Sequence, residues 1–502
     1  MARGDVGSWT VQAEDGSGPP DGQLRLADLR KLGRRAVRAV VGAARAEDRV
    51  TFGRLLVEHL AVDTSDLDVV EESWPSYDHV NVQAGLDAWL AASGREHQLV
   101  GVVNFRHREF GLSELLRGHG RQEVHGPSPG NVARVNLASG PGGQVRPCVR
   151  CALYLVSDGD RRAALLLRGA EPEMGMSRIM VQIVADRRET ASAMATQIRD
   201  LAVVHNVYRG QVVSFGRDMF GERDTVLRFH ERPATTVDDL ILPGETLAAI
   251  GRQVVTVAEH REQLLAARQH LKRGLLLYGP PGVGKTHTVR YLVGRLVDTT
   301  IVQLTGDSLS LIGPACSVAR TLQPAMIVVE DVDLIAEDRG RYPGDHPLLF
   351  QLLNEMDGLA EDADVVFLLT TNRADVLEQA LAARPGRVDQ AVKLELPDAE
   401  ARRRLFHLYR GDLTVDESRL ESVLERTDGV TASFLKELLR RAAVIAAEKD
   451  GAGPLSVTAD QLDAALDELL DTRNAMTRVL LGGQRNRARL AEDAVGPGIR
   501  QA

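Results

Sequence analysis

A glycine-rich run from Gly279 to Thr286, with the sequence GPPGVGKT, has the spacing GxxxxGK[ST]. The apolar run RGLLLY precedes it and the helical pattern THTVRYLVGRLV follows it, which is the strand-loop-helix context in which such a run binds phosphate. Glycines let the backbone approach a ligand closely, and the amides at a helix N-terminus attract anions. We therefore predict that Lys285 binds the β and γ phosphates of a nucleotide and that Thr286 binds Mg²⁺. The residues predicted to bind the nucleotide are Gly279, Pro280, Pro281, Gly282, Val283, Gly284, Lys285, Thr286 and His287.

Three carboxylates follow another apolar run. The segment MIVV ends at Val329 and is followed by Glu330, Asp331 and Asp333, and Glu330 comes 45 positions after Lys285 (330 − 285). Carboxylates that follow an apolar run must contact solvent or a cation, because an unpaired buried charge is costly. Mg²⁺ accompanying ATP is the natural candidate for that cation. Acidic groups beside a phosphate loop hold the metal and activate water in phosphoryl transfer. The spacing therefore predicts hydrolysis as well as binding.

Further polar groups follow the later apolar run DVVFLLTTN, which ends in Thr371 and Asn372. Asn372 either orients water near the γ phosphate or simply caps the strand. The run ARPGR places Arg384 and Arg387 in a tight turn, because Pro-Gly favours one. In isolation these arginines would be solvated charges, whereas beside a nucleotide site they suggest guanidinium groups presented across a subunit boundary. The candidate catalytic residues are Asp331, Asn372, Arg384 and Arg387, and the candidate metal ligands are Thr286 and Glu330.

Together these residues resemble the AAA ATPase family over about residues 240–470. The similar motifs besides GPPGVGKT and the acidic strand end are LLNEMDGL at 352–359, TTNR at 370–373, ARPGRVD at 383–389 and TDGVTASFL at 427–435. The resemblance implies a parallel α/β sheet with a helical lid, a ring that is usually hexameric, and ATP-driven remodelling of macromolecules, most often proteins. It also implies that Arg384 and Arg387 are arginine fingers reaching a neighbour's ATP and that Asn372 is the first sensor.

Three departures from the family pattern bear on mechanism. The order Glu330-Asp331 replaces the usual Asp-Glu and resembles the group that contains the mitochondrial Rieske-protein translocase, which puts Glu330 at the metal-holding position and Asp331 at the water-activating one. The segment expected to grip substrate in a central pore is SLIG at 310–313, where Leu311 offers less surface than the usual aromatic residue. Near the second sensor, Ala432 stands where glycine is usual.

The patterning predicts a chain of class α/β, with a P-loop parallel-sheet ATPase domain, a C-terminal helical lid and a preceding α+β N-terminal domain. A helical segment after the first 23 residues carries Arg30, Arg34 and Arg38 along one face, which is either solvated or docks an acidic partner. The expected units are a disordered lead-in at 1–23, the N-terminal domain at 24–220, a linker at 221–250, the ATPase domain at 251–397, the lid at 398–471 and a mobile tail at 472–502.

Composition limits the partners. The chain has 502 residues with 61 Lys and Arg against 70 Asp and Glu, and a net charge of −9 repels nucleic acid phosphates. It has three cysteines, with no apolar leader and no run of 18 uncharged apolar residues, so we expect a soluble, cytoplasmic protein without a membrane partner. Cys148 and Cys151 form a lone CxxC, which fits two ordinary thiols better than metal or redox work.

The leading functional hypothesis is an ATP-hydrolysing ring ATPase that remodels a protein partner chosen by the N-terminal domain. One alternative is a nucleotide-dependent regulatory switch or scaffold with slow hydrolysis, which Leu311 and the Glu-Asp order favour. A nucleic-acid remodelling ATPase is the other alternative, and the acidic balance opposes it. No HExxH follows the helical segments, so we expect no fused zinc protease.

Overall fold

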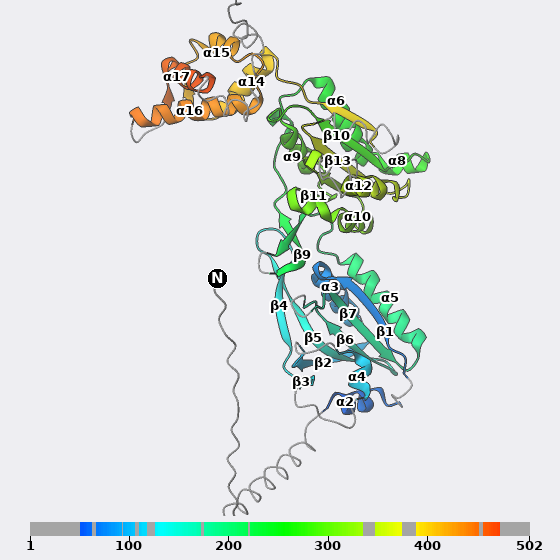
Figure 1. Ribbon diagram of the computed structural model, residues 1–502. Helices are drawn as coiled ribbons and strands as arrows, with labels where there is room; N and C mark the ends of the chain where they lie inside the picture. Colours follow the sequence, from blue (N-terminus) through cyan, green and yellow to red (C-terminus); the bar gives the residue numbers. More distant parts are fainter. Residues whose placement is uncertain are drawn as a thin grey trace, which may run out of the picture.

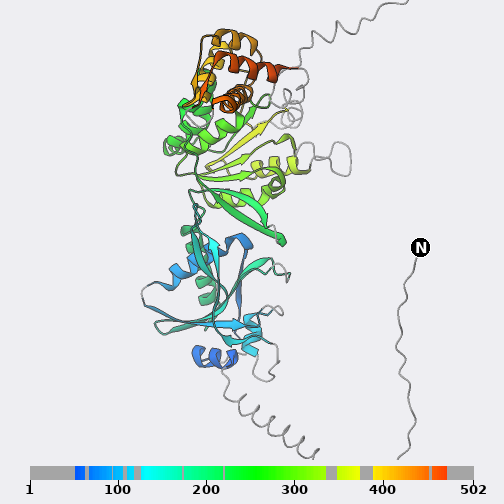
Figure 2. The ribbon, with the colours of Figure 1, turned by 90° about the vertical axis from the view of Figure 1, so that its left-hand side faces the viewer.

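The computed structural model describes residues 51–62, 67–92, 94–105, 110–117, 126–171, 175–218, 221–334, 347–373, 388–450 and 455–471. Three units follow one another along a column: an N-terminal α+β unit, a unit built on a parallel sheet, and a helical unit (Figures 1 and 2). The predicted lead-in, the arginine-bearing face at 30–38 and the tail at 472–502 lie outside the described residues.

An antiparallel sheet forms the centre of the N-terminal unit. Its order is β1-β7-β6-β5-β2-β3, and β4 pairs with β5. Helices α3 and α5 pack on one face, and α2 and α4 pack on the other. Strand β6 is buried along residues 163–168 because both of its faces are covered. The bounds are α2 (Phe52–Leu60), β1 (Val70–Pro75), η1 (Ser76–Asp78), α3 (His79–Leu90), β2 (Arg95–Val103), α4 (Leu112–Arg117), β3 (Ser128–Gly130), β4 (Ala133–Ala138), β5 (Val145–Asp158), β6 (Arg161–Arg168), β7 (Arg178–Ala185) and α5 (Arg188–Val204).

The two cysteines of the CxxC run lie three positions apart on strand β5 and pack in different hydrophobic cores. Cys148 packs in the core shared with the parallel sheet, and Cys151 packs in the core beneath α2 and α4. Burial raises the pKa of the Cys148 thiol to about 11 and that of Cys151 to about 12. The described residues contain no group of three or more His, Cys, Asp or Glu side chains placed to hold a metal ion.

The middle unit is a sheet of order β14-β10-β13-β12-β11-β8-β9, parallel except for the edge strand β9. Alternate residues of each strand face two separate cores: Leu275 and Leu277 pack under α6 and α9, whereas Leu276 packs under α10 and α12. This confirms the predicted parallel sheet. The bounds are β8 (Val212–Asp218), β9 (Gly221–His230), η3 (Val237–Asp239), α6 (Gly244–Gly251), η4 (Arg252–Thr256), α7 (Val257–Glu259), α8 (Arg261–Ala266), β10 (Arg273–Tyr278), α9 (Lys285–Arg295), β11 (Thr300–Leu304), η5 (Gly306–Leu311), α10 (Ile312–Thr321), β12 (Ala325–Val329), α12 (Pro347–Asp357), β13 (Val365–Thr371) and β14 (Gln390–Lys393).

Strands β8 and β9 form a hairpin that extends this parallel sheet. Val212 pairs with Ile301, and Val213 pairs with Val302. Tyr208 and Phe215 pack in the same core as the strands of the parallel sheet, so the N-terminal unit and the sheet share buried surface. The expected boundary at 220/221 falls inside the hairpin, and the expected linker contains β9 and α6. The local pattern could not show this, because the pairing joins segments far apart in the sequence.

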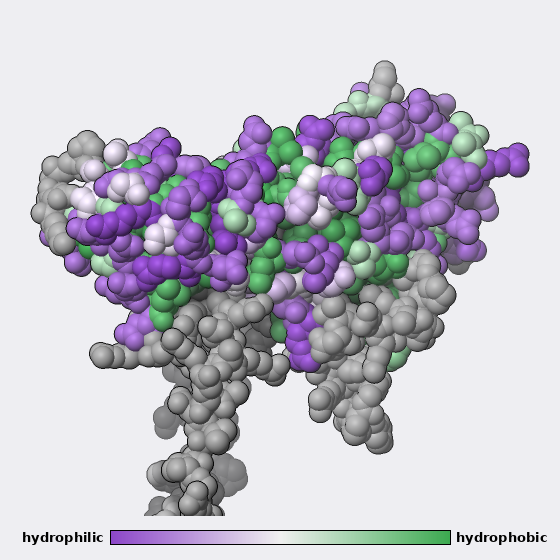
Figure 3. All heavy atoms as spheres, turned by 90° about the horizontal axis from the view of Figure 1, so that it is seen from above, coloured by the Kyte–Doolittle hydropathy of each residue, from purple (hydrophilic) through white to green (hydrophobic). Residues whose placement is uncertain are grey.

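The helical unit contains α14 (Ala399–Arg410), α15 (Leu420–Arg426), α16 (Ala432–Asp450) and α17 (Ala459–Leu470), with β15 (Thr414–Val415) paired to β16 (Ser456–Val457). Phe406, Phe434 and Leu438 are fully buried in its core. Viewed from this end, hydrophilic residues cover most of the helical unit, and more hydrophobic residues are visible over the neighbouring sheet unit (Figure 3). None of the helices described here has the length and apolar character needed to cross a bilayer.

Candidate nucleotide site

The glycine-rich run forms a tight loop between β10 and α9. Gly279, Gly282 and Gly284 have φ values of +150°, +80° and +107°, which side chains rarely tolerate. A Cβ atom on Gly279 would lie 2.2 Å from the carbonyl oxygen of Leu394, so no side chain fits there. Helix α9 begins at Lys285, directly after the loop. Its first amides therefore face the space that the loop encloses, as an anion cradle requires.

Lys285 is buried in this loop, with 7% of its surface exposed. Its Nζ donates to the carbonyl oxygens of Gly279 at 2.8 Å and of Pro280 at 2.9 Å. An ammonium group has three hydrogens, so a third remains for a phosphate oxygen. Burial lowers the pKa of Lys285, and the nearby carboxylates of Asp331 and Asp333 oppose that effect.

Thr286 and Glu330 meet at the predicted metal position. The Thr286 hydroxyl donates to Glu330 Oε2 at 2.7 Å. The backbone amide of Glu330 donates to the carbonyl of Leu304, at the end of β11, over 3.2 Å. A hydroxyl and a carboxylate are hard oxygen donors of the kind that Mg²⁺ prefers, and both lie beside the phosphate loop. The residues present therefore fit the ion.

Asp331 and Asn372 lie side by side because β12 and β13 are parallel neighbours whose carboxyl ends meet at one edge. Asn372 Nδ2 donates to Asp331 Oδ1 at 3.2 Å. Asp331 has φ +51°, a conformation uncommon outside glycine, and its carboxylate is exposed. Asp333 is buried and accepts from the Thr371 hydroxyl at 2.8 Å and from the Asn372 amide at 3.3 Å. Asp333 thus holds the strand end, while Asp331 faces outward.

Two contacts of this site were missed by the sequence analysis. His287 Nε2 donates to the carbonyl of Asp239 at 3.1 Å, which brings η3 to the start of α9. Ser433 of α16 donates its backbone amide to the carbonyl of Gly282 at 3.2 Å, so the helical unit touches the phosphate loop. Thr236 and Asp239 form a capping box, and that spacing in the sequence was a signal for η3.

The predicted pore segment is folded against the sheet. Leu309 and Ile312 are buried, and the half-buried Leu311 packs against the core that the N-terminal unit shares. The side chain of Ser308 accepts from the amide of Thr305 and donates to its carbonyl, both at 2.8 Å, which fixes the start of η5. Arg384 and Arg387, the predicted arginine fingers, lie outside the described residues.

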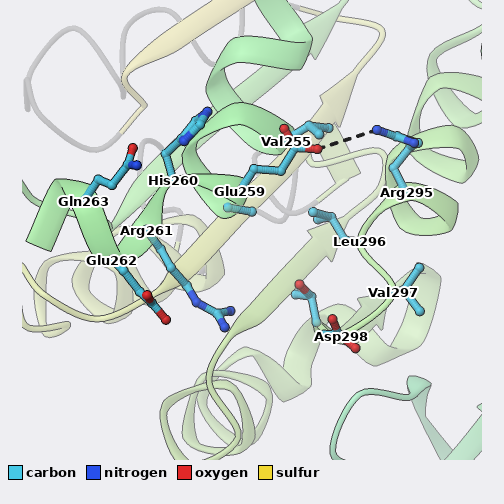
Figure 4. Close-up of a pocket in the computed structure, with 12 residues that line it drawn as sticks. Val255, Glu259, His260, Arg261, Glu262, Gln263, Arg295, Leu296, Val297 and Asp298 are labelled. Carbon is cyan, nitrogen blue, oxygen red and sulfur yellow. Dashed lines mark ion pairs between the residues drawn. The ribbon is translucent and has the colours of Figure 1, made fainter.

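A pocket of about 410 Å³ lies at the opposite end of α9 from the phosphate loop. Figure 4 shows Glu259 and Arg295 pointing toward each other across it, and their charged groups are 3.6 Å apart. Helix α9 has 11 residues, so the pocket is about 16 Å from the phosphate loop and is not the nucleotide site.

Comparison with known proteins agrees with the loop geometry. The model of the family described as "ATPase family associated with various cellular activities (AAA)" matches residues 275–396. The chain is 29% identical over 281 residues to the chloroplastic ATP-dependent zinc metalloprotease FTSH 1 of Oryza sativa subsp. japonica, covering 53% of this chain and 39% of that protein. It is 34% identical over 244 residues to the ATP-dependent zinc metalloprotease FtsH 2 of Sphaerobacter thermophilus, covering 46% of this chain and 35% of that protein.

A third relative is the ATP-dependent zinc metalloprotease FtsH of Thermus thermophilus, which is 29% identical over 254 residues, covering 48% of this chain and 40% of the relative. The chain therefore spans well under half the length of these three curated relatives. The similarity to the Rieske-protein translocase group stays a prediction from the Glu330-Asp331 order. The phosphate loop, the acidic strand end and the family match agree that the chain carries an AAA ATPase domain at residues 275–396.

Proposed function

We propose that this chain hydrolyses ATP. One observation carries the proposal: the Thr286–Glu330 pair and the Asp331–Asn372 pair lie together at the carboxyl edge of the sheet, directly beside the loop that holds Lys285. This arrangement supplies a phosphate cradle, oxygen ligands for a cation and an exposed carboxylate near ordered amide donors. Those are the parts that phosphoryl transfer to water needs.

The roles of the residues follow from their positions. Lys285 and the loop amides bind the β and γ phosphates, and Thr286 with Glu330 would hold Mg²⁺, which neutralises phosphate charge when bound. Asp331 accepts the proton of the attacking water, and Asn372 orients that water. The water oxygen bonds to the γ phosphorus while the bond from that phosphorus to the β–γ bridging oxygen breaks, releasing ADP and phosphate.

The proposal includes assembly of the chain with copies of itself. A ring, usually a hexamer in the family it resembles, would let Arg384 and Arg387 of one subunit reach the nucleotide of the next. The support is the order of motifs in the sequence and the match to the AAA family. Arginine supplied in trans stabilises charge that develops on the transferred phosphoryl group.

We propose that the work of this ATPase is to remodel a protein partner in the cytoplasm, with the N-terminal unit choosing the partner. The relatives are named as ATP-dependent proteases, so they act on proteins. The net charge of −9 favours a protein over a nucleic acid partner. The partner's identity does not follow from the fold, because specificity resides in sites outside the matched domain.

A second candidate, a nucleotide-dependent switch with slow hydrolysis, is favoured by one observation. Leu311 packs against a hydrophobic core, and the capping contacts of Ser308 fix the segment before it. A segment held in this way presents little surface for gripping an extended polypeptide. In this reading, ATP binding changes assembly or partner affinity, and hydrolysis resets the state.

Steady-state phosphate release by the full chain, with and without Mg²⁺, tests the proposal. We expect Mg²⁺-dependent turnover that Lys285→Ala abolishes, and stimulation by added protein substrate such as unfolded casein but not by DNA. A switch would give slow turnover unaffected by either, together with a change of assembly when a non-hydrolysable ATP analogue binds. No turnover and no nucleotide binding would exclude both candidates.

A further inference from the structure

Residues 232–239, here called the strap, follow β9, include η3 and run along helix α9 in the opposite direction. Arg232 contacts the C-terminal end of α9, and Asp239 contacts His287 in its first turn. Between them, the backbone of Pro233 and Thr235 passes Gly294. One segment therefore touches both ends of the helix whose N-terminus forms the phosphate cradle.

Arg232 makes four hydrogen bonds to backbone carbonyls. Its Nη1 donates to the carbonyls of Val293 at 2.6 Å and Leu296 at 2.8 Å, which lie at the C-terminal end of α9. Helix ends leave carbonyls without helical partners, and a cation there is stabilised by the helix dipole. Its Nη2 donates to the carbonyls of Thr299 at 3.0 Å and Gly210 at 2.9 Å. The planar guanidinium is suited to joining several acceptors at once.

Gly210 brings the N-terminal unit into this contact, because it lies in the connection between α5 and β8. Tyr208 in the same connection is buried, and its hydroxyl donates to the carbonyl of Tyr77 at 2.5 Å. A single side chain thus joins the N-terminal unit to the far end of the phosphate-loop helix. Figure 1 shows β9, which leads into the strap, lying between the two units.

The strap also lies against α9 with no space for an extra atom. A Cβ on Gly294 would be 2.6 Å from the carbonyl oxygen of Pro233, which is backbone and cannot rotate away. Glycine is an unfavourable residue in a helix interior, so its presence here accords with the close approach of the strap. By contrast, a Cβ on Gly251 in α6 would meet nothing within 4 Å.

We propose that Arg232 is a positioning residue for the ATPase site, which transmits movement between the N-terminal unit and the phosphate-loop helix through the strap. The proposal rests on the proposed function, since it concerns regulation of that same site. Coupling of this kind is reciprocal. Nucleotide that orders α9 also orders the 206–211 connection and changes the affinity for a partner bound there, and that partner changes nucleotide affinity by the same factor.

Hydrogen exchange of the full chain with and without ADP and Mg²⁺ tests this. In the wild type we expect ADP to slow exchange at the phosphate loop and also at 206–211. In Arg232→Gln the protection at the loop persists and that at 206–211 disappears, while ADP affinity falls about 2- to 30-fold, the usual range for residues that carry coupling. Arg232→Lys keeps the positive charge but lacks the planar guanidinium that donates to several carbonyls at once. It should therefore restore part of the protection at 206–211.

Gly294→Ala is a second variant that displaces the strap without touching the guanidinium, and it serves if Arg232→Gln folds poorly. Its matched control is Gly251→Ala, and the control for charge at the same helix end is Arg295→Gln, whose side chain is exposed. We expect both controls to behave as wild type. Retained protection at 206–211 in Arg232→Gln and Gly294→Ala would overturn the coupling role, whereas absence of ADP binding by the wild type would overturn the proposed function and this inference together.

Discussion

The hydroxyl of Thr286 lies 2.7 Å from a carboxylate oxygen of Glu330, although the two residues are 44 positions apart in the sequence. Thr286 is in the first turn of α9 and Glu330 follows the last residue of β12. The carboxyl ends of parallel strands and the helices that follow them meet at one edge of a sheet. The pair therefore marks that edge as the place where phosphate and metal would bind.

Lys285→Ala tests the phosphate loop. The ammonium is already held by the carbonyls of Gly279 and Pro280, so its loss removes a preorganised charge without removing packing from the sheet. We expect ATP affinity to fall by at least ~100-fold, because hydrogen bonds to charged groups are worth about 1.5–3 kcal/mol and the phosphate charge adds to this. Calorimetric titration with ATP and Mg²⁺ measures the loss.

Lys393→Ala is the control for that measurement, since Lys393 is exposed on β14 and pairs with Glu395. It should bind ATP as the wild type does. Equal affinity in Lys285→Ala and wild type would mean that the loop is not the nucleotide site.

Asp331→Asn and Glu330→Gln separate the two acidic roles. Asp331→Asn keeps the size of the side chain and an oxygen that can accept from Asn372, but it cannot accept a proton from water. Hydrolysis should therefore fall about 10²- to 10⁴-fold, with ATP affinity retained. Glu330→Gln removes the charge beside Thr286, so both ATP affinity and the Mg²⁺ dependence should weaken. Phosphate release over a range of Mg²⁺ concentrations distinguishes them. A hydrolysis-specific defect in Glu330→Gln, with Asp331→Asn weak in binding, would reverse the assignment.

Local spacing was enough to predict that the central residues of this candidate site lie together. The loop glycines, Lys285 and Thr286 are contiguous, and the carboxylates and Asn372 each end an apolar run, so strand order alone brings them together. The three apolar runs RGLLLY, MIVV and DVVFLLTTN all became strands of the parallel sheet. Arg384 and Arg387 remain predictions, because they lie outside the described residues.

Long-range pairing was not predictable in the same way. The sequence of β8 reads as the end of the N-terminal domain, yet it pairs with β11, which follows it by far more than one supersecondary unit. The contacts of Arg232 with four backbone carbonyls leave no trace in the spacing of side chains, because carbonyls belong to every residue. The contact of Ser433 with Gly282 depends likewise on how two separately folded units meet.

Asp78→Asn tests the carboxyl group of Asp78, which lies where η1 meets helix α3 in the N-terminal unit. Burial raises the pKa of Asp78 to about 6, and a hydrogen bond from Asn81 partly opposes this. The folded chain holds this proton more tightly than the unfolded chain, so the contribution of Asp78 to stability is full below the unfolded pKa of 3.8 and is lost as pH rises through about 6. The variant should therefore be more stable than wild type at pH 8, by at most ~3 kcal/mol, and equal to it near pH 3.5.

Urea unfolding followed by tryptophan fluorescence measures this difference, because Trp74 and Trp89 both lie in the N-terminal unit. Asp186→Asn is the control, since the Asp186 side chain is 46% exposed. If the difference between Asp78→Asn and wild type were the same at pH 4 and pH 8, the buried carboxyl would not be titrating in this range.

Arg387→Ala tests whether subunits complete one another's sites. An arginine finger supplied in trans contributes roughly 10³ to 10⁵ in turnover in phosphoryl-transfer enzymes, or about 4 to 7 kcal/mol of barrier. The variant should retain ATP affinity, because the phosphate loop of its own subunit is unchanged, while hydrolysis falls by that order. Calorimetry and phosphate release on the same preparation measure the two quantities.

Mixing Arg387→Ala with Lys285→Ala provides the decisive arm. A subunit carrying Arg387→Ala still binds ATP, and a neighbour carrying Lys285→Ala still offers Arg387, so a mixed assembly contains complete sites that neither parent has. We expect the mixture to recover a measurable part of wild-type turnover, rising with the fraction of mixed neighbours. An arginine that served its own subunit could not be rescued in this way, because each subunit would still lack one essential group. If a mixture shown by differential tagging to co-assemble were as inactive as either parent, Arg387 would not act on a neighbouring subunit and would be only a residue of the ARPGR turn.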